Sequence, residues 1–493
     1  MEEPRARARR LARGQLARVS RRRFLTTATA AMGGIAAARF TLPPQRMAPL
    51  IDVGVQDRLY PTPLGIGGVG INAHTHDFAR TTAGIDFQGD LRAARIKLVR
   101  TVAYPDDQSP GHDVVYVDTN VKAILGVGAA PLFVHYIAPG LPYLRTLRAD
   151  GVGATDGTVS TNLVALVQRY QQPPYNLHIQ HWEIGNEPDF AIDYRVSRPA
   201  EYTRIFNTCH DALVAAGLRD RVVLCGPAVS APYHGPDSAT YSSRIIDAVL
   251  DTCAHSVDVL TYHHYAAPTA SATDLLTTLD DLEDATQPSA PGQHGVAALR
   301  ARMDRVRFAR PHVGIGLTEH NTVSFQHELP GGLWNLGLLH HYLYNPRGLL
   351  TTAYVFDDYG SQQGGYGLYD VRKHRDYTYW ALWINGNLRG SEVLHYTYTP
   401  SGAAPAEAWP ALLVTATRDA SRLYVEVINR RAVPVQAEVN VRGVPTTSMA
   451  TLFMLAEGIL PLRGRPMRLG ARFTHTFPAL SASIFTWPRG QDR

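Results

Sequence analysis

Eight short apolar runs, spread over residues 64–357, are the feature that most limits how this chain can fold. Most of them are nearly continuous in apolar residues, which is typical of parallel strands buried on both faces of a sheet. The runs lie at residues 65–74, 94–101, 130–136, 177–185, 221–227, 257–265, 312–320 and 349–357.

Several segments between these runs have helical periodicity. One apolar stripe begins behind Ser160 or Thr161 as a predicted N-cap, and another is closed by Gly217. The stripes are Leu163, Val164, Leu166, Val167 and Tyr170; Tyr202, Ile205, Phe206, Cys209 and Leu213; and Val296, Leu299, Met303 and Val306. Eight alternations of strand and helix predict an α/β fold, a (β/α)8 TIM barrel. A doubly wound open sheet fits the alternation too, but no glycine-rich nucleotide-binding loop follows the first strand.

The pattern changes after about residue 385. Runs such as RLYVEVINRR and VPVQAEVNVRG alternate partly with period two and are separated by turn residues. They predict a C-terminal antiparallel β-sandwich. We therefore expect a catalytic barrel over residues 60–380 and an accessory sandwich over 385–493, to which residues 45–59 could add a strand.

The basic pI of about 9.0 comes from one end of the chain. Residues 1–25 contain nine arginines and two glutamates, a net charge of +7, whereas the whole chain carries +5. The remainder is therefore close to neutral, at about −2. A nucleic-acid partner has no electrostatic support.

The arginine-rich start resembles a twin-arginine export signal. SRRRFLTTATAAMGGIAAA places an arginine pair before Phe24-Leu25, and three alanines suited to a signal peptidase follow a mildly apolar segment. We expect residues 1–38 to be this signal, with the twin-arginine machinery as a partner and an extracellular, periplasmic or cell-surface location. A disordered basic tail is the alternative. No later apolar run approaches the length of a transmembrane helix.

Neither cysteines nor histidines form a convincing metal motif. Cys209, Cys225 and Cys253 follow no metal-ligand spacing. The sequence leaves open whether two of them form a disulfide. The histidines offer only a loose HTHD pattern at residues 74–77. We expect no metal and no cofactor.

Polar residues end the predicted strands, where the catalytic groups of such barrels lie. Glu187 ends the fourth run and Glu319 the seventh, so the two should face each other across the barrel mouth. Glycoside cleavage needs such a pair, one carboxyl protonated and one ionised. The residues alone leave two mechanisms open: attack on the sugar by one carboxylate, or attack on the sugar by a water molecule. Other strand-end residues are Asn72, His74, His76, Arg100, His135, Asn186, His263, His264, Tyr265 and Asp357.

Three stretches resemble glycoside hydrolase clan A, whose members are retaining (β/α)8 enzymes. WEIGNEP, at residues 182–188, looks like the clan's acid/base signature. LTEHN, at residues 317–321, is similar to the nucleophile strand of family 39, and residues 365–390 resemble that family's passage into its accessory domain. Families 51 and 30 are the nearest alternatives.

The resemblance implies roles for particular residues. Glu187 would be the general acid/base and Glu319 the nucleophile, with Asn186 hydrogen-bonded to the sugar 2-hydroxyl. Arg100 would lie beside Glu319 and keep it ionised. His264 and Tyr265 would position Glu319 and the substrate.

His135 and Asp357 complete the expected substrate-binding set. Alternative readings are a structural ion pair for Arg100 and a hydrogen-bonded core histidine for His135. The chain departs from the clan pattern at the eighth strand, where AYVFDDYG lacks the usual tryptophan, and at His320, where an aromatic residue is common.

These observations predict an exported retaining glycoside hydrolase that cleaves O-glycosidic bonds by double displacement. Its substrate would be an oligosaccharide, a polysaccharide or a glycoside. The alternative is a non-catalytic carbohydrate-binding surface protein on the same barrel. Two glutamates together with Asn186 and Arg100 favour the enzyme, because a binder needs no acid and nucleophile. Sugar, linkage, exo or endo action and oligomeric state stay open.

Overall fold

The computed structural model divides the chain into Met1–Arg46 and one compact unit, Met47–Arg493. The predicted export segment lies outside the described residues, so the fold below is that of the second unit. The structure describes residues 48–59, 68–73, 85–102, 114–135, 156–189, 199–235, 238–279, 295–310, 312–344, 348–353, 367–370, 372–400 and 411–489.

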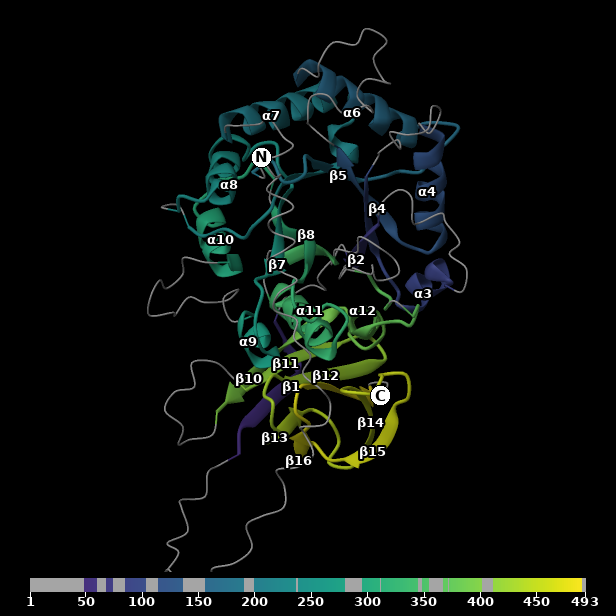
Figure 1. Cartoon of the computed structure of the whole chain (residues 1–493), viewed down its shortest axis with the longest axis vertical. Coiled ribbons are helices and arrows are strands. Elements are labelled where there is room, and N and C mark those ends of the chain that lie inside the picture. Colours follow the sequence, from purple (N-terminus) through teal and green to yellow (C-terminus); the bar gives the residue numbers. More distant parts are fainter. Residues whose placement is uncertain are drawn as a thin grey trace, which may run out of the picture. The chain divides into compact units, whose positions relative to one another are not determined.

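Eight parallel strands close into a barrel (Figure 1). Closure is made by the first strand, which pairs with the second on one side and with the eighth on the other. The predicted (β/α)8 fold is confirmed, and the open-sheet alternative is wrong. The strands are β2 (Gly68–Ala73), β3 (Leu98–Val102), β4 (Ala130–His135), β5 (His181–Ile184), β6 (Val223–Val229), β7 (Val259–Ala266), β8 (Gly314–Thr322) and β9 (Gly348–Ala353).

Helices cover the outside of the barrel and bury the predicted apolar stripes against it. The described helices are α3 (Phe87–Ala93), α4 (Val114–Gly126), α6 (Asp156–Gln171), α7 (Pro199–Ala215), the short 3-10 helix η1 (Arg219–Arg221), α8 (Tyr241–Thr252), α9 (Ala272–Thr277), α10 (Gly295–Met303), α11 (Leu329–Leu343) and α12 (Tyr377–Asn387).

The predicted end of α7 is confirmed, whereas the predicted start of α6 is wrong. Gly217 has a φ of 68°, and the Leu218 N–H donates to the Leu213 carbonyl at 2.9 Å, which closes the helix. Ser160 and Thr161 lie inside α6, which begins at Asp156. The helix extends a turn before its apolar stripe, so the stripe alone could not locate its first residue.

The barrel interior changes from apolar to charged along its axis. Leu98, Leu132, Cys225 and Val259 form a small buried cluster inside the strands. Side chains two residues apart on a strand share a face, so Arg100 follows Leu98 into the interior nearer the carboxyl end. This places the charged residues at the end where the strand-following loops begin.

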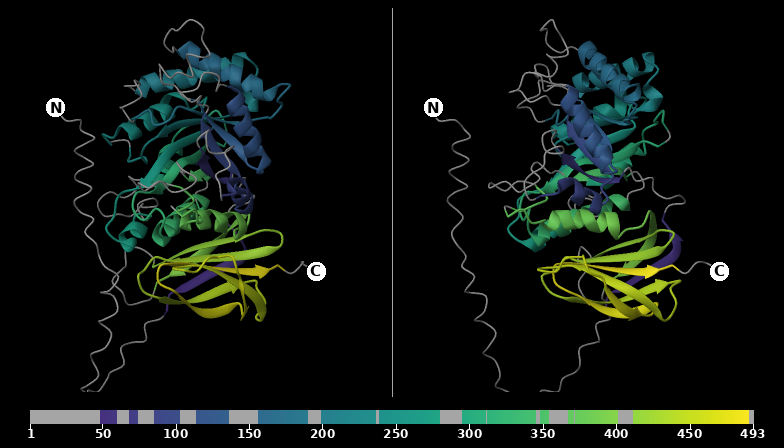
Figure 2. Two further views of the ribbon diagram at one scale, coloured as in Figure 1. Left: turned by 45° about the vertical axis from the view of Figure 1, so that its right-hand side comes forward. Right: turned by 90° about the vertical axis from the view of Figure 1, so that its right-hand side faces the viewer.

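The remaining strands form one nine-stranded sheet that folds over a common apolar core (Figure 2). The pairing is antiparallel except between β1 and β13, so the predicted antiparallel sandwich is confirmed with one parallel pair. The strands are β1 (Leu50–Arg58), β10 (Glu392–Thr399), β11 (Leu412–Arg418), β12 (Arg422–Asn429), β13 (Val435–Arg442), β14 (Ser448–Leu455), β15 (Arg465–Leu469), β16 (Arg472–Phe477) and β17 (Ser481–Pro488).

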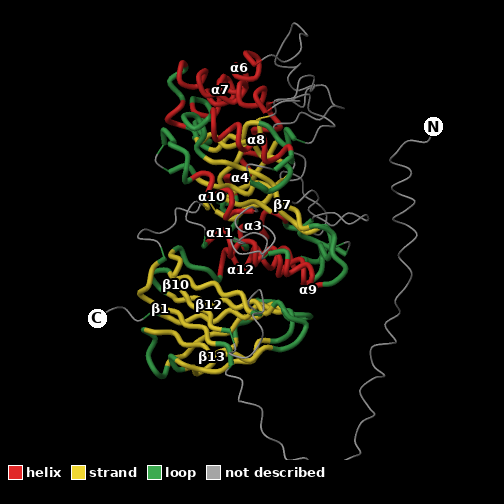
Figure 3. The backbone as a smooth tube through the Cα atoms, turned by 90° about the vertical axis from the view of Figure 1, so that its left-hand side faces the viewer, coloured by secondary structure: helices red, strands yellow, loops and turns green. Residues whose placement is uncertain are grey.

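Helices α11 and α12 lie between the barrel strands and this sheet (Figure 3). Every residue of α11 is buried, and His340 is within 2.9 Å of the Thr415 hydroxyl of β11. Arg389, just after α12, makes a buried bidentate contact with Glu426 of β12. Leu413 and Ile428 belong to the same apolar cluster as the barrel core. Barrel and sheet therefore share part of their interior.

The three cysteines are free and buried. Burial raises the pKa of the Cys209 thiol to about 12, so this cysteine is an apolar core residue rather than a nucleophile. Among the described residues, no helix is both long and apolar enough to cross a bilayer.

Candidate active site

The end of β5 sets the position of Glu187. Trp182 and Ile184 pack outward into the helical layer, while Glu183 between them points inward. The chain then turns through Gly185, with a φ of 87°, and Glu187, with a φ of 45°. The Glu187 N–H donates to the Ala228 carbonyl at 2.8 Å. A glutamate held in the left-handed region costs about 1–3 kcal/mol, and such strain is often found at functional sites.

Glu319 lies on β8, a strand with every residue buried. Its Oε1 accepts from Arg100 Nη1 at 2.6 Å, and its Oε2 accepts from the Tyr265 hydroxyl at 2.6 Å. The pairing with β7 is irregular here, because Tyr262 pairs with Leu317 and His263 pairs with Glu319. Thr318 is the extra residue, and this bulge turns Glu319 inward.

The two carboxylates lie close together. A ring nitrogen of His263 and one oxygen each of Glu187 and Glu319 all lie within 4.8 Å of one another. Retaining glycosidases hold their carboxyl groups roughly 5–5.5 Å apart, whereas inverting enzymes need about 6.5–9.5 Å for an intervening water. The separation of the two carboxylates here therefore fits the arrangement of a retaining enzyme.

His263 lies between the carboxylates. Its Nδ1 is 2.9 Å from Glu187 Oε1 and 3.4 Å from Glu319 Oε2. Its Nε2 is buried and has no hydrogen-bond partner among the described residues. With a hydrogen on Nδ1, the ring donates to Glu187 Oε1.

Arg100 joins β8 to β5. Its Nε donates to Glu183, its Nη1 to Glu319 and its Nη2 to the Asn186 side-chain oxygen, each at 2.6 Å. The arginine is 2% exposed. Because the Asn186 oxygen faces Arg100, its amide nitrogen is left to donate elsewhere. Arg100 is thus both the expected site residue and the structural ion pair of the alternative reading.

The sequence analysis did not identify Glu183 as a site residue, and it named His263 only as a strand-end residue without a role. Glu183 is fully buried and belongs to WEIGNEP itself. The alternation of inward and outward side chains along a strand could have found it, because Trp182 and Ile184 are clearly core residues. His263 shares the inward face of β7 with Tyr265 for the same reason.

Burial and charge act against each other at Glu187, whose side chain is 24% exposed. Burial raises the pKa of its carboxyl, but the hydrogen bond from His263, the charge of His263 and the charge of Arg100 together lower it by more. The net result is a lowered pKa, so Glu187 is ionised at neutral pH in the free protein.

Two expected site residues point away from the carboxylates. His135 faces α6, where its Nε2 lies 2.9 Å from the Val159 carbonyl, as a hydrogen-bonded core histidine. His264 stacks on Trp334 of α11 with ring centroids 5.6 Å apart. Each is next to an inward-facing position, so strand alternation turns it outward. Burial lowers the pKa of both rings to about 4.

The departures from the clan pattern can be followed in part. His320 points outward and lies 2.9 Å from the Asn335 side-chain oxygen of α11. Trp334 is buried and donates to the Thr278 hydroxyl, so it is no sugar platform. Asp357 and the aromatic residues around it lie outside the described residues.

Two groups in the described part of the chain have the donors of a metal site. One is Glu187, His263 and Glu319, and the other is His210, Asp211 and His255 near the surface. In the first group both oxygens of Glu319 already accept from Arg100 and Tyr265. The neighbouring guanidinium charge also opposes a cation there. The arrangement fits a hydrogen-bonded acid–nucleophile pair better than a metal centre.

No protein-family model matches the sequence, and a search of curated proteins finds no match. Solved structures resemble this one over almost their whole length. An α-L-arabinofuranosidase from Thermotoga maritima is 16% identical, with a TM-score of 0.64 over 90% of this chain and 100% of that one. A glycoside hydrolase family 44 endoglucanase from Clostridium thermocellum is 15% identical, with a TM-score of 0.64 over 90% and 100%.

A third neighbour is a glycoside hydrolase family 30 xylanase from Clostridium acetobutylicum, 14% identical with a TM-score of 0.59 over 89% of this chain and 99% of that one. At these identities the likeness concerns the fold. The resemblance to clan A glycoside hydrolases is confirmed at that level.

Proposed function

We propose that this protein is a retaining glycoside hydrolase that cleaves O-glycosidic bonds by double displacement. The observation that carries the proposal is the approach of Glu187 and Glu319 to within 4.8 Å at the carboxyl ends of β5 and β8. A binding protein has no need for this pair. The barrel fold shared with glycoside hydrolases adds to the argument.

In the first step, Glu319 attacks the anomeric carbon while Glu187 gives its proton to the departing oxygen. The glycosidic bond breaks, and a covalent ester joins the sugar to Glu319. In the second step, Glu187 takes a proton from water, the water oxygen bonds to the anomeric carbon, and Glu319 is released as carboxylate. Arg100 and Tyr265 orient Glu319 throughout through their hydrogen bonds.

Asn186 and His263 support these steps. The amide nitrogen of Asn186 would donate to the sugar 2-hydroxyl, since its oxygen accepts from Arg100. Glu187 must carry a proton when the bond breaks, although its pKa is lowered in the free protein. Burial is the largest single effect on Glu187, and a sugar over the carboxylates excludes more water. We therefore expect substrate binding to raise this pKa.

A panel of chromogenic aryl glycosides tests the proposal, with the anomer first released read by proton NMR. We expect turnover of at least one glycoside with retained configuration, unaffected by EDTA. Inverted product would contradict the direct attack by Glu319. Loss of activity on chelation would favour a metal at Glu187, His263 and Glu319. Saturable sugar binding without turnover would favour the non-catalytic alternative.

The substrate class we propose is an oligosaccharide, a polysaccharide or a glycoside. The solved neighbours include proteins described as arabinofuranosidase, xylanase and endoglucanase, which gives a starting panel of arabinofuranosides, xylosides and glucosides.

Export through the twin-arginine machinery is part of the proposal and rests on residues 1–38. Replacing Arg22 and Arg23 by lysine should hold a tagged chain in the cytoplasm, because that route reads the arginine pair. Fractionation of cells carrying either form provides the measurement. Equal export of both forms would contradict the assignment of residues 1–38 as a twin-arginine signal.

A further inference from the structure

A cavity lies at the opposite end of the barrel from the two carboxylates. It has a volume of about 200 Å³, and its lining includes the turn between α3 and β3, helix α12 and the segment between α12 and β10. A single water needs only about 10–15 Å³ by the same measure, so the cavity can hold a small molecule. Its occupant would be an inorganic ion or a compound of monosaccharide size.

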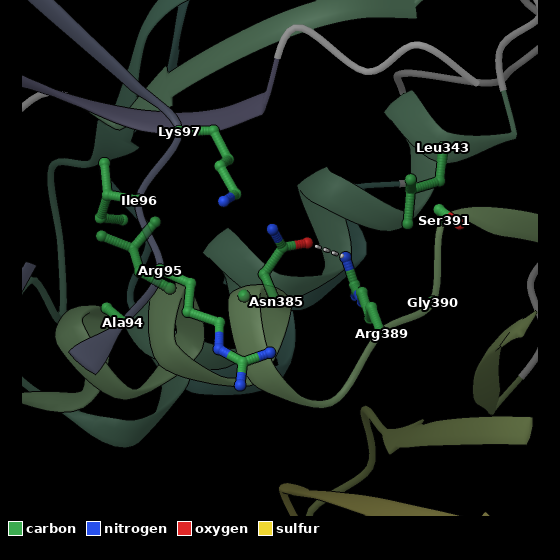
Figure 4. A pocket seen from close by; sticks show the side chains of 11 residues that line it. Ala94, Arg95, Ile96, Lys97, Leu343, Asn385, Arg389, Gly390 and Ser391 are labelled. Atoms are coloured by element: carbon green, nitrogen blue, oxygen red, sulfur yellow. Dashed lines mark hydrogen bonds between the residues drawn. The ribbon is translucent and has the colours of Figure 1, made fainter. Parts of the chain in front are cut away.

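Only hydrogen-bond donors among the charged and amide groups face this cavity. Figure 4 shows the Lys97 ammonium and the Asn385 amide nitrogen pointing toward one another, with the Arg95 guanidinium below Asn385. The Asn385 oxygen accepts from Arg389 Nη1 at 2.9 Å. Because arginine only donates, this bond fixes the amide orientation and leaves the NH₂ group toward the cavity.

Charge in the cavity is unbalanced. Arg389 is neutralised by its two bonds to Glu426, at 3.0 and 2.9 Å. No carboxylate of the described residues forms an ion pair with Arg95 or Lys97, and no acidic side chain is among the lining residues. Two exposed positive charges and an oriented amide donor therefore lie along the lining of one cavity that opens to solvent.

The backbone beside the cavity adopts a conformation that is unfavourable for most residues. Arg95 has a φ of 53°, at the turn position after a helix where glycine is usual. A Cβ at Gly386 would lie 2.0 Å from the Ala94 carbonyl oxygen, so α12 packs directly on this turn. A strained arginine that turns its side chain into a cavity is a reason to ask what it binds.

We propose that this cavity binds a small anion bearing a carboxylate or phosphate group. Lysine supplies a compact positive charge suited to phosphate, and arginine a planar pair of donors suited to carboxylate. The two sources that fit the volume are inorganic phosphate and a monosaccharide acid. The proposal does not depend on the glycosidase function, since the cavity lies away from Glu187 and Glu319.

Thermal unfolding of the full chain tests it. Sodium phosphate and sodium glucuronate are titrated separately in chloride buffer of matched ionic strength. We expect a saturable rise in melting temperature with one of the two, since a ligand that binds only the folded state stabilises it. Saturation by phosphate alone identifies the free ion, and by glucuronate alone a sugar acid. No saturation with either overturns the proposal.

Variants separate a built site from general ionic effects. Arg95→Asn keeps a residue that tolerates the left-handed conformation, and Lys97→Met keeps the length of the side chain. Each should weaken binding at least about tenfold, as the loss of one charged contact of ~1.4 kcal/mol requires. Lys373→Asn is the matched control, because Lys373 is exposed and has a φ of 65° away from the cavity. Equal shifts in wild type, Arg95→Asn and Lys97→Met would overturn the proposal.

Discussion

Arg100 connects the residues of the candidate active site. It bonds Glu183, Glu319 and Asn186 at once while almost fully buried. A buried guanidinium is expensive unless its donors are satisfied, and Glu183 and Asn186 accept from Nε and Nη2. These two contacts hold Arg100 in place while its Nη1 donates to Glu319.

The acid role of Glu187 predicts an effect that depends on the leaving group. Glu187→Gln should lower kcat/KM by roughly 10²–10⁴-fold for a poorly activated aryl glycoside, where the departing oxygen needs a proton. For a well-activated dinitrophenyl glycoside the loss in the first step should be much smaller. Glu319→Gln serves as the comparison, since it should abolish turnover of both. Equal losses with Glu187→Gln would argue against proton donation.

The balance at Glu187 predicts how its ionisation responds to its neighbour. His263→Ala removes the hydrogen bond and charge that oppose burial, so the pKa of Glu187 should rise. Carbon NMR of labelled glutamate side chains measures it, with Glu187→Gln identifying the signal. In the free variant, Glu187 should take up its proton at higher pH than in the wild type. An unchanged or lower midpoint would mean that His263 does not control this carboxyl.

The place of a single site residue could be predicted from the sequence in two cases only. Either the residue belonged to a motif, or the alternation of inward and outward side chains along its strand (strand parity) gave its direction. WEIGNEP identified Glu187 and Asn186, yet His264 and Tyr265 were expected to act together although neighbours on a strand face opposite ways. Parity places His263 with Tyr265 instead. On β8 parity fails, because Ile315 and Leu317 face outward and the bulge at Thr318 turns Glu319 inward. Only the LTEHN motif pointed to Glu319.

At the scale of elements, close packing joins the starts of helices α11 and α12. Gly332 of α11 lies against Tyr377 at the start of α12, where a Cβ would meet the Tyr377 carbonyl oxygen at 2.6 Å. Backbone cannot move aside as a flexible side chain can. The two helices can therefore cross only while this position is glycine.

Gly332→Ala should lower the free energy of unfolding by about 1–3 kcal/mol, the usual cost of overpacking. Urea unfolding followed by circular dichroism gives the value. Gly126→Ala is the control, because nothing lies within 4 Å of a Cβ there at the end of α4. It should be neutral or stabilise by up to about 1 kcal/mol. Equal changes in the two variants would mean that the close contact with Tyr377 does not constrain this position.

Element type and order were largely predictable, whereas element boundaries were not. All eight barrel runs overlap the observed strands, because parallel strands buried on both faces leave a strong apolar signal. The start of α6 was missed, since its first turn carries no apolar stripe. The place of β1 between β10 and β13 depends on pairing across more than 300 residues of sequence, which no local pattern encodes.

At the scale of the whole molecule, buried histidines make stability depend on pH. Burial lowers the pKa of His135 and His264 to about 4 and that of His320 to about 3. The unfolded chain binds these protons near pH 6.5, whereas the folded chain does not. Stability is therefore greatest above pH 6.5 and falls as the pH drops toward 4.

The free energy of unfolding should decline between pH 7 and pH 5, a window in which most carboxylates stay ionised. Each histidine contributes a slope of up to about 1.4 kcal/mol per pH unit. Denaturant unfolding at several pH values measures the decline. His320→Asn keeps an amide nitrogen near Nδ1 and cannot titrate, so its slope should be smaller by about one proton. A slope identical to that of the wild type would show that His320 is not held neutral.

Covalent trapping of the sugar on Glu319 tests the central claim most directly. A 2-fluoro sugar with a good leaving group, matched to the best glycoside of the panel, should form the ester quickly and release it slowly, because fluorine destabilises the positively charged transition states. Mass spectrometry of the digested protein should then find the sugar on the peptide that contains Glu319, and Glu319→Gln should remain unlabelled. A label on any other residue would contradict the account.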